Sequence, residues 1–329
     1  MDWESILGNG LEAAIGRDAI VFALAAIGLN VHFGYTGLLN FGQVAFMAVG
    51  AYGVGIGVIE FDLSLWVAVL LGIAAAVVLA LLLGLPTLRL RADYLAIVTI
   101  ATGEMLRFIF RAASLRDFTG GSNGINGFAS DFYDVNPYTG GLDLGLIDFS
   151  ADQKWLITVG WLLVFGAVGL VWALMRSPWG RVLKAIREDE DAVRSLGKNV
   201  YFFKMQSLVL GGVIGAFGGM VLAVSGGSVQ PDNYGTATTF FAYVALILGG
   251  TARIWGPVIG SIIFWALISI SDSALRQAVR EDYIPESIMS GVQVGQVRFM
   301  LVGLGLVLLL VFRPQGIFGD KDEIALAAR

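Results

Sequence analysis

The sequence predicts an all-α integral membrane protein with about nine membrane segments, some of them broken or re-entrant. Composition is the first reason: 57% of the 329 residues are hydrophobic and 14% are charged. The second is that apolar runs of roughly 18 residues, enough to cross a bilayer as helix, recur along the chain. The third is that the alternating ten-residue pattern of an outer-membrane barrel does not occur. We expect residues 1–329 to form a single transmembrane domain.

Several classes of protein are excluded by what the sequence lacks. There is no cysteine, which excludes disulfide frameworks, thiol catalysis and thiolate metal sites. No GxxxxGK[ST] motif occurs, because the pair Gly197–Lys198 is followed by Asn199 and lacks the earlier glycine. His32 is the single histidine, and we expect it to pack inside the first span. The sequence therefore predicts no catalytic residue, no metal, no cofactor and, without a basic surface, no nucleic-acid partner.

Two spans near the N-terminus are separated by a polar interruption. The first runs from about Ala19 to Phe33 and leads into GYTGLLNFGQ, Gly34–Gln43, where Asn40 and Gln43 are polar groups at membrane depth. Irregular backbone at that depth is tolerated only where it lines a cavity or packs against protein. The second span, Val44–Ile59, contains four glycines, which favour close helix contact over phosphate binding. The acidic segment before both spans lacks the basic region of a signal peptide, and we expect it to be retained.

The next two spans lead to a candidate functional carboxylate. The third span is Leu65–Leu85, and the fourth, Tyr94–Phe110, holds Glu104 near mid-membrane with Arg107 one turn later. An intramembrane carboxylate costs roughly 2.5–3.5 kcal/mol on insertion scales, which makes Glu104 a candidate functional residue. The alternative is an i,i+3 pair with Arg107 that faces the bundle interior as structural glue.

A long polar segment and two further spans occupy the middle of the chain. The segment Arg111–Gln153 is glycine-rich and acidic, and a loop of this size is usually functional or mobile. The fifth span is Trp155–Met175 and the sixth is Met205–Val224. The sixth has a glycine at every fourth residue, at Gly211, Gly215 and Gly219. We expect these glycines to form a continuous small face for tight helix contact.

A second interruption lies in the C-terminal part. The apolar run Thr239–Gly249 is too short to cross a bilayer upright, and GGTARIWGP follows it before the spans 258–271 and 299–312. The two interruptions, Gly34–Gln43 and Gly249–Pro257, take corresponding positions in the two halves, which favours a pathway built from a repeat. No residue-level internal similarity accompanies them.

Charge is concentrated in the stretch Arg176–Lys204, which must lie in water. Seven basic and four acidic residues occur there. Ser177 and Pro178 are typical of a helix start, and Gly197 of a helix end. Apolar residues at three- and four-residue steps predict one stripe along one or two short helices: Val182, Leu183, Ile186, Val193 and Leu196. A plain solvated loop explains the basic charge but neither the cap nor the stripe.

The basic loops predict the orientation. With nine segments, the loop of Arg89 and Arg91, the stretch Arg176–Lys204 and the tail after Arg313 all fall on one side, and basic loops face the cytosol. The N-terminus and the loop 111–153 are then extracytoplasmic, and the C-terminus is cytosolic. We expect a multi-pass protein of a bacterial or archaeal inner membrane.

Four motifs occur in order along nearly the whole chain. They are GYTGLLNFGQVAFMAVGAYG (34–53), Gly103–Glu104 followed by TGGSNGI (119–125), AIREDEDAVRSLGKNV (185–200) and RPQGIFG (313–319). Together they resemble the LivM-type membrane subunit of branched-chain amino-acid ABC importers. The resemblance implies a permease that forms half of a translocation path. It also implies four kinds of partner: a second permease of the same fold, two cytosolic ATPase subunits, an extracytoplasmic substrate-binding protein and the lipid bilayer.

The resemblance further implies that the stretch 176–204 couples the permease to the ATPase. Importer permeases share a looser signature: an acidic residue, two small residues, any three residues and then a glycine. Asp191, Ala192, Val193 and Gly197 match it. Asp191 and Val193 depart from the usual glutamate and alanine. The expected coupling residues are Arg187, Glu188, Asp191, Ala192, Val193, Leu196 and Gly197. We expect Asn40, Gln43 and Glu104 to shape or gate the substrate path.

Three functions other than a branched-chain amino-acid importer permease are compatible with a membrane protein of this kind. A urea or short-amide ABC importer would differ only in cargo. An ion-coupled secondary transporter would use Glu104 as a proton or sodium site, but it gives no reason for a capped and striped helix in the charged stretch. A channel would need a symmetric filter, and no repeat of carbonyl or charge rings can be read in the sequence.

Overall fold

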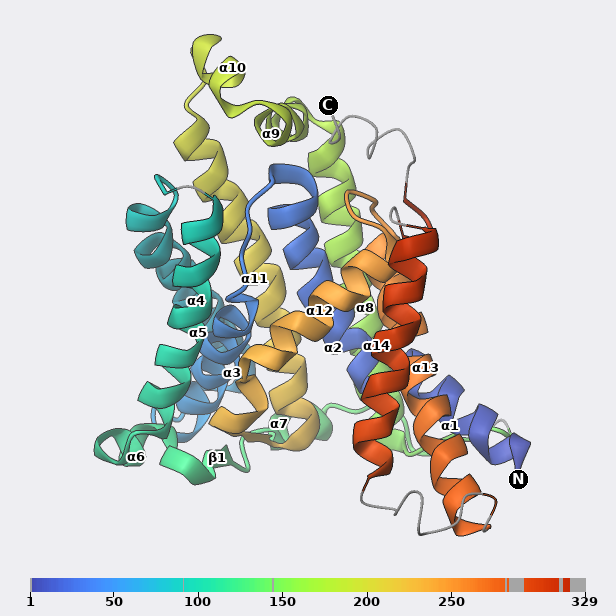
Figure 1. The fold of residues 1–329 in the computed structure, drawn as a ribbon. Helices are drawn as coiled ribbons and strands as arrows, with labels where there is room; N and C mark the ends of the chain where they lie inside the picture. Colours follow the sequence, from blue (N-terminus) through green and yellow to red (C-terminus); the bar gives the residue numbers. More distant parts are fainter. Residues whose placement is uncertain are drawn as a thin grey trace.

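The computed structural model describes residues 2–90, 92–143, 145–281, 283, 293–313 and 316–319. These residues form a helical bundle (Figure 1). Its main helices are α1 (Trp3–Ile15), α2 (Arg17–Leu29), α3 (Gln43–Ile59), α4 (Leu65–Thr87), α5 (Ala92–Arg111), α8 (Ala151–Arg176), α9 (Pro178–Glu188), α10 (Glu190–Ser195), α11 (Val200–Gly226), α12 (Thr236–Gly249), α13 (Gly256–Arg280) and α14 (Val294–Phe312). Each predicted membrane segment coincides with one helix, so the all-α membrane fold is confirmed. Among the described residues, five helical stretches are long and apolar enough to cross a membrane: Trp3–Tyr35, α4, α8, α11 and α13.

Two helices differ from the prediction. Helix α1 was not predicted, and it packs against α13 so closely that a Cβ on Gly10 would lie 2.5 Å from Ile270. Helix α13 continues well past the predicted end at residue 271. Its polar C-terminal part is stabilised by Asp272, which accepts hydrogen bonds from Arg276 at 2.7 Å and from Arg298 at 2.9 Å. Paired charges allow a helix to extend beyond the apolar run that the sequence shows.

Helix α11 forms the centre of the bundle. It packs on α2, α3 and α4. Of the 18 residues that form its apolar stretch, 72% are buried inside the protein, whereas the same fraction is 33% for α4 and 28% for α8. An apolar helix that stays exposed along its length suits contact with lipid, whereas α11 is enclosed by protein. The helices around α11 therefore position the polar groups described below.

The predicted small face of α11 is confirmed. A Cβ on Gly219 would lie 2.0 Å from the carbonyl oxygen of Met47, and one on Gly215 would lie 2.0 Å from the side-chain nitrogen of Gln43. Real Cβ atoms do not approach other atoms this closely, so α3 reaches α11 only because glycine stands at these positions. The glycines of the second span act in the same way, since a Cβ on Gly50 would lie 2.8 Å from Ala216.

The segment 111–153 is folded rather than an open loop. Its short elements are η2 (Ala113–Leu115), α6 (Arg116–Thr119), η3 (Gly121–Asn123), β1 (Ile125–Asn126), α7 (Ser130–Asp134), β2 (Leu142–Asp143) and β3 (Asp148–Phe149). Two further short elements, β4 (Ser228–Val229) and η4 (Pro231–Tyr234), lie between α11 and α12. Strand β1 pairs antiparallel with β4, with Ile125 opposite Val229. β2 pairs with β3. The sequence analysis did not predict these two-residue strands, which are too short to show an alternating pattern.

The folded segment 111–153 and the charged stretch lie at opposite ends of the bundle. Figure 1 shows α6, α7 and β1 at the lower end together with the N-terminus, and α9 and α10 at the upper end. Arg91 and the chain from residue 320 onward, which the sequence analysis used for orientation, lie outside the described residues.

Candidate functional site

The first predicted interruption is a break between α2 and α3, and we call residues 30–42 the first break. After Leu29 the chain widens into one π-helical turn, η1 (Asn30–Tyr35). Gly37 then takes a left-handed conformation, φ +74°, which favours glycine, and the chain is irregular until α3 begins. Backbone groups in such a segment need partners from elsewhere in the chain.

A buried polar network supplies these partners. Asn40 donates one hydrogen bond to Gln43 Oε1 and one to His32 Nδ1, both at 3.1 Å. His32 Nε2 donates to the carbonyl of Leu208 at 3.2 Å, because a carbonyl can only accept, so Nδ1 is the acceptor for Asn40. Gln43 donates to the carbonyl of Gly211 at 3.0 Å. Asn40, Gln43 and His32 are fully buried, so the network joins the first break to α11.

The second interruption, residues 250–255 between α12 and α13, lies against the first. We call it the second break. The side chain of Asn30 joins the two, since its Nδ2 donates to the carbonyl of Arg253 and its Oδ1 accepts from the backbone N–H of Ala252, both at 2.8 Å. Asn30 was not predicted as a site residue, although an asparagine at the end of an apolar span is visible in the sequence.

Helix α12, the short helix that crosses the front of the bundle in Figure 1, holds the first break from its other side. Thr239 Oγ1 accepts from the backbone N–H of Val44 at 3.0 Å. The Tyr243 hydroxyl donates to the carbonyl of Asn40 at 2.9 Å. Neither residue was predicted, because one threonine and one tyrosine in a short apolar run carry no signal of their own.

The RPQGIFG motif ends α12. The backbone N–H of Ile317 donates to the carbonyl of Leu248 at 2.9 Å, and that of Phe318 donates to Gly249 at 3.3 Å. These carbonyls have no partner within their own helix, so the motif serves as a C-terminal cap. Pro314 and Gln315 of this motif lie outside the described residues.

Glu104 lies apart from this network, at the opposite end of α12. Its Oε2 pairs with Arg107 Nη2 at 2.7 Å, and Arg107 also reaches Asp232 at 3.3 Å. Its Oε1 accepts from the backbone N–H of Thr236 at 3.2 Å, at the start of α12. A carboxylate is favourable there because helix N-termini carry partial positive charge. The i,i+3 pair that the sequence allowed is present, and the same carboxylate caps α12.

The charged stretch 176–204, which we call the charged loop, contains two short helices. Ser177 Oγ accepts from the backbone N–H of Trp179, and Pro178 is the first residue of α9, as predicted. Asp189 caps α10, because its side chain accepts from the backbone N–H groups of Asp191 and Ala192. Gly197 has φ +76° and ends α10, also as predicted.

The apolar stripe of the charged loop faces mostly inward. Leu183, Ile186 and Val193 are buried, so Val193, one of the expected coupling residues, is not open to a partner. These side chains instead pack α9 and α10 onto the chain's own membrane helices. Leu196 is the exception, because 80% of its surface is exposed.

Four other predicted residues lie on the exposed surface around Leu196. Glu188, Asp191, Ala192 and Gly197 are all exposed. Arg187 is also exposed, but its Nη1 donates to the carbonyl of Gly34 in the first break at 2.5 Å. The seven predicted residues are therefore brought close together in the loop but point in two directions.

Comparison with known proteins identifies the family. Residues 13–312 match the family described as branched-chain amino acid transport system / permease component. The chain is 31% identical over 327 residues to the LivM permease protein of the high-affinity branched-chain amino acid transport system of Escherichia coli, covering 96% of this chain and 71% of that protein. The chain belongs to this permease family. The resemblance expected from the motifs is thus confirmed.

Other members are similar along most of this permease. A probable branched-chain amino acid transport permease protein LivM of Methanocaldococcus jannaschii is 25% identical over 346 residues, covering 92% of each chain. The LivH permease protein of the Escherichia coli system is 25% identical over 308 residues, again covering 92% of each chain. One organism thus has two proteins, LivM and LivH, that are both similar to this permease.

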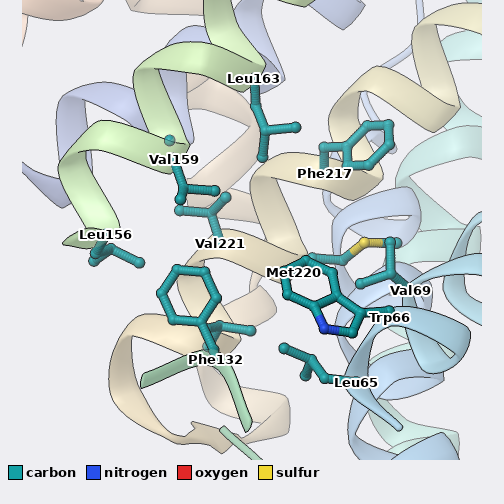
Figure 2. A pocket seen from close by; sticks show the side chains of 12 residues that line it. Leu65, Trp66, Val69, Phe132, Leu156, Val159, Leu163, Phe217, Met220 and Val221 are labelled. Carbon is teal, nitrogen blue, oxygen red and sulfur yellow. The ribbon is translucent and has the colours of Figure 1, made fainter. Parts of the chain in front are cut away.

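An apolar groove of about 140 Å³ opens on the side of the permease (Figure 2). Side chains of α4, α7, α8 and α11 line it, among them Trp66, Phe132, Leu163 and Met220. None of its lining residues carries a charge, so a zwitterionic ligand would lose its hydration there without replacement. We therefore do not assign the groove to the substrate path.

Proposed function

We propose that the chain is the permease subunit of an ABC importer for branched-chain amino acids, in which residues 1–329 form one domain and half of the translocation path. The observation that carries the proposal is the charged loop, where capped helices expose Leu196 to a partner and Arg187 reaches a helix break. ATP hydrolysis then takes place in two separate cytosolic subunits, and the chain itself is not an enzyme. An extracytoplasmic binding protein delivers the substrate.

A second permease of the same fold is the proposed partner within the membrane. Helix α5 supports this, because its exposed side chains follow each other at three- and four-residue steps: Tyr94, Ile97, Ala101, Met105 and Phe108. They form one apolar face, while Glu104 and Arg107 of the same helix bond to Thr236 and Asp232 of their own chain, so the face itself is open to an apolar partner. The likeness of the chain to both LivM and LivH of one organism supports a pair of related subunits.

Asn40, Gln43 and Glu104 have an indirect role in the proposed path. Asn40 and Gln43 are fully buried and bonded to the chain's own groups, and Glu104 holds the start of α12. We propose that they shape and gate the path by fixing the first break and α12, rather than binding the substrate. Specificity then lies in the separate binding protein.

The energy source tests the proposed function. In vesicles that contain the assembled importer and its binding protein, leucine uptake is expected to require ATP and to be unaffected by an imposed proton or sodium gradient. Glu104→Gln is expected to retain ATP-driven uptake within about threefold, because an amide oxygen still accepts from Thr236. Uptake driven by an ion gradient and abolished in this variant would instead establish a secondary transporter. Competition by urea but not by leucine would establish the urea importer.

The orientation is proposed from the basic loops, with the N-terminus and the segment 111–153 outside and the charged loop in the cytosol. The sequence contains no cysteine, so single cysteines can be placed at Ser122 and Ser195, both exposed and at opposite ends of the bundle. On intact cells an impermeant maleimide is expected to label position 122 only, and to label position 195 after the membrane is opened. Labelling of position 195 on intact cells would reverse the orientation.

A further inference from the structure

Arg187 connects the charged loop to the first break by two kinds of contact. Its guanidinium donates to the carbonyl of Gly34. The aliphatic part of its side chain lies over Gly37, where a Cβ would stand 3.4 Å from Arg187 Cγ. Gly37 is held at φ +74°, a conformation that disfavours a residue with a Cβ. Arg187 thus contacts the break within its π-helical turn, at Gly34, and just after the turn, at Gly37.

The contacts continue from the first break to the second. A Cβ on Gly34 would lie 2.0 Å from Asn30 Oδ1 and 2.8 Å from the backbone nitrogen of Ala252, so these three residues touch without intervening space. Asn30 bonds to Ala252 and to Arg253 on the far side. Ala252 has φ +56°, a conformation that a residue with a Cβ keeps only when its surroundings hold it. The hydrogen bond from the Ala252 N–H to Asn30 is one contact that stabilises it.

The charged loop has room to move relative to the first break. A cavity of about 270 Å³ separates part of the loop from the break. It is lined by Thr36, Gly37 and Leu38 of the break, by Ile186, Arg187, Glu190 and Lys204 of the loop, and by Leu88, Leu90 and Leu95. Close packing on that side would fix the two parts together, and the cavity shows that they are not closely packed there. Movement of α9 would therefore reach the break through Arg187 and through Lys184, whose ammonium lies 5.8 Å from the centre of the Tyr35 ring.

We propose that Arg187 is a positioning residue that transmits movement of the charged loop to both helix breaks. The inference rests on the proposed function, in which the ATPase subunits move the loop. A shift of α9 displaces the carbonyl of Gly34, and because Gly34 touches Asn30 and Ala252, the second break shifts with it. The two breaks then rearrange together, so that they act as one gate at the end of the bundle nearest the charged loop.

The number of substrate molecules transported per ATP hydrolysed tests this role. In the assembled importer in liposomes, Arg187→Ala is expected to lower this ratio about tenfold while ATP hydrolysis stays within about twofold. Arg187→Lys, which keeps a charged donor, is expected to restore part of the ratio. Arg181→Ala removes an exposed arginine from the same helix and is expected to leave the ratio unchanged. A residue that only stabilised the loop would lower hydrolysis and transport in proportion, and that result would overturn the proposal.

A second measurement follows the movement itself. Fluorophores attached to single cysteines at Ser195 in the charged loop and at Trp255 in the second break are expected to respond to ATP in the parent importer. In Arg187→Ala the response at position 195 is expected to remain and the response at position 255 to disappear. An unchanged response at position 255 would overturn the proposal. If Arg187→Ala does not assemble with its partners, Arg187→Gln replaces it in both measurements. A transport ratio or a fluorescence response equal to that of the parent would then also overturn the proposal. A parent that responds at neither position contradicts the proposed function itself, which distinguishes the two failures.

Discussion

Replacing Leu196 with glutamate is expected to weaken association with the ATPase subunits by about 100-fold while leaving the permease inserted and folded. Leu196 is 80% exposed at the end of α10, next to the cap at Gly197. Burying a leucine side chain in a partner contributes about 1.5–3 kcal/mol, and a charge in its place leaves an unpaired group in the interface. Because the side chain makes few contacts within its own chain, the fold does not depend on it. Co-purification of the ATPase with the variant, followed over a concentration series, measures the effect.

Two further variants control for folding and for exposed leucines in general. Val193→Asp changes a buried residue of the same helix, so it is expected to destabilise the charged loop and to lower the yield of permease as well. Leu146→Glu changes an exposed leucine in the segment 111–153 and is expected to leave ATPase association unchanged. Parental association of Leu196→Glu would show that the ATPase docks elsewhere.

Replacing Gly219 with valine is expected to destabilise the permease by at least about 3 kcal/mol, with a fall of about 10 °C in the midpoint of thermal unfolding or a failure to accumulate. The added Cβ would lie 2.0 Å from the carbonyl oxygen of Met47 in α3. Backbone cannot move aside as a flexible side chain can, so α3 and α11 would have to separate along the centre of the bundle. Size-exclusion chromatography and thermal unfolding of the solubilised protein report the change.

Gly166→Val is the matched control for this substitution. Gly166 lies in α8, is exposed, and has no atom within 4 Å of the position that a Cβ would take. The same valine is therefore expected to change the unfolding midpoint by less than about 2 °C. Equal behaviour of the two variants would mean that the contact between α3 and α11 is looser than the structure indicates.

The sequence by itself determined the membrane class, the positions of the nine predicted membrane segments and the local structure of the charged loop. Each of these depends on neighbours along the chain. Apolar runs of bilayer length mark the spans, and Ser177, Pro178 and Gly197 mark helix ends through backbone conformation and capping. The small face of α11 was also predicted from the sequence, because glycines spaced four residues apart lie on one side of a helix whatever that side contacts.

Only the tertiary structure decided which groups meet. Asn40 and Gln43 were visible as polar residues at membrane depth, but their partners are carbonyls and side chains far away in sequence, such as Gly211. The stripe of the charged loop was correctly read as apolar, yet periodicity does not say whether an apolar face packs on its own chain or on a partner. The link from Arg187 through Gly34 and Asn30 to Ala252 joins three segments whose proximity depends on how α9, α2 and α12 pack. Such contacts are set by the packing of the whole bundle, and no local pattern in the sequence records them.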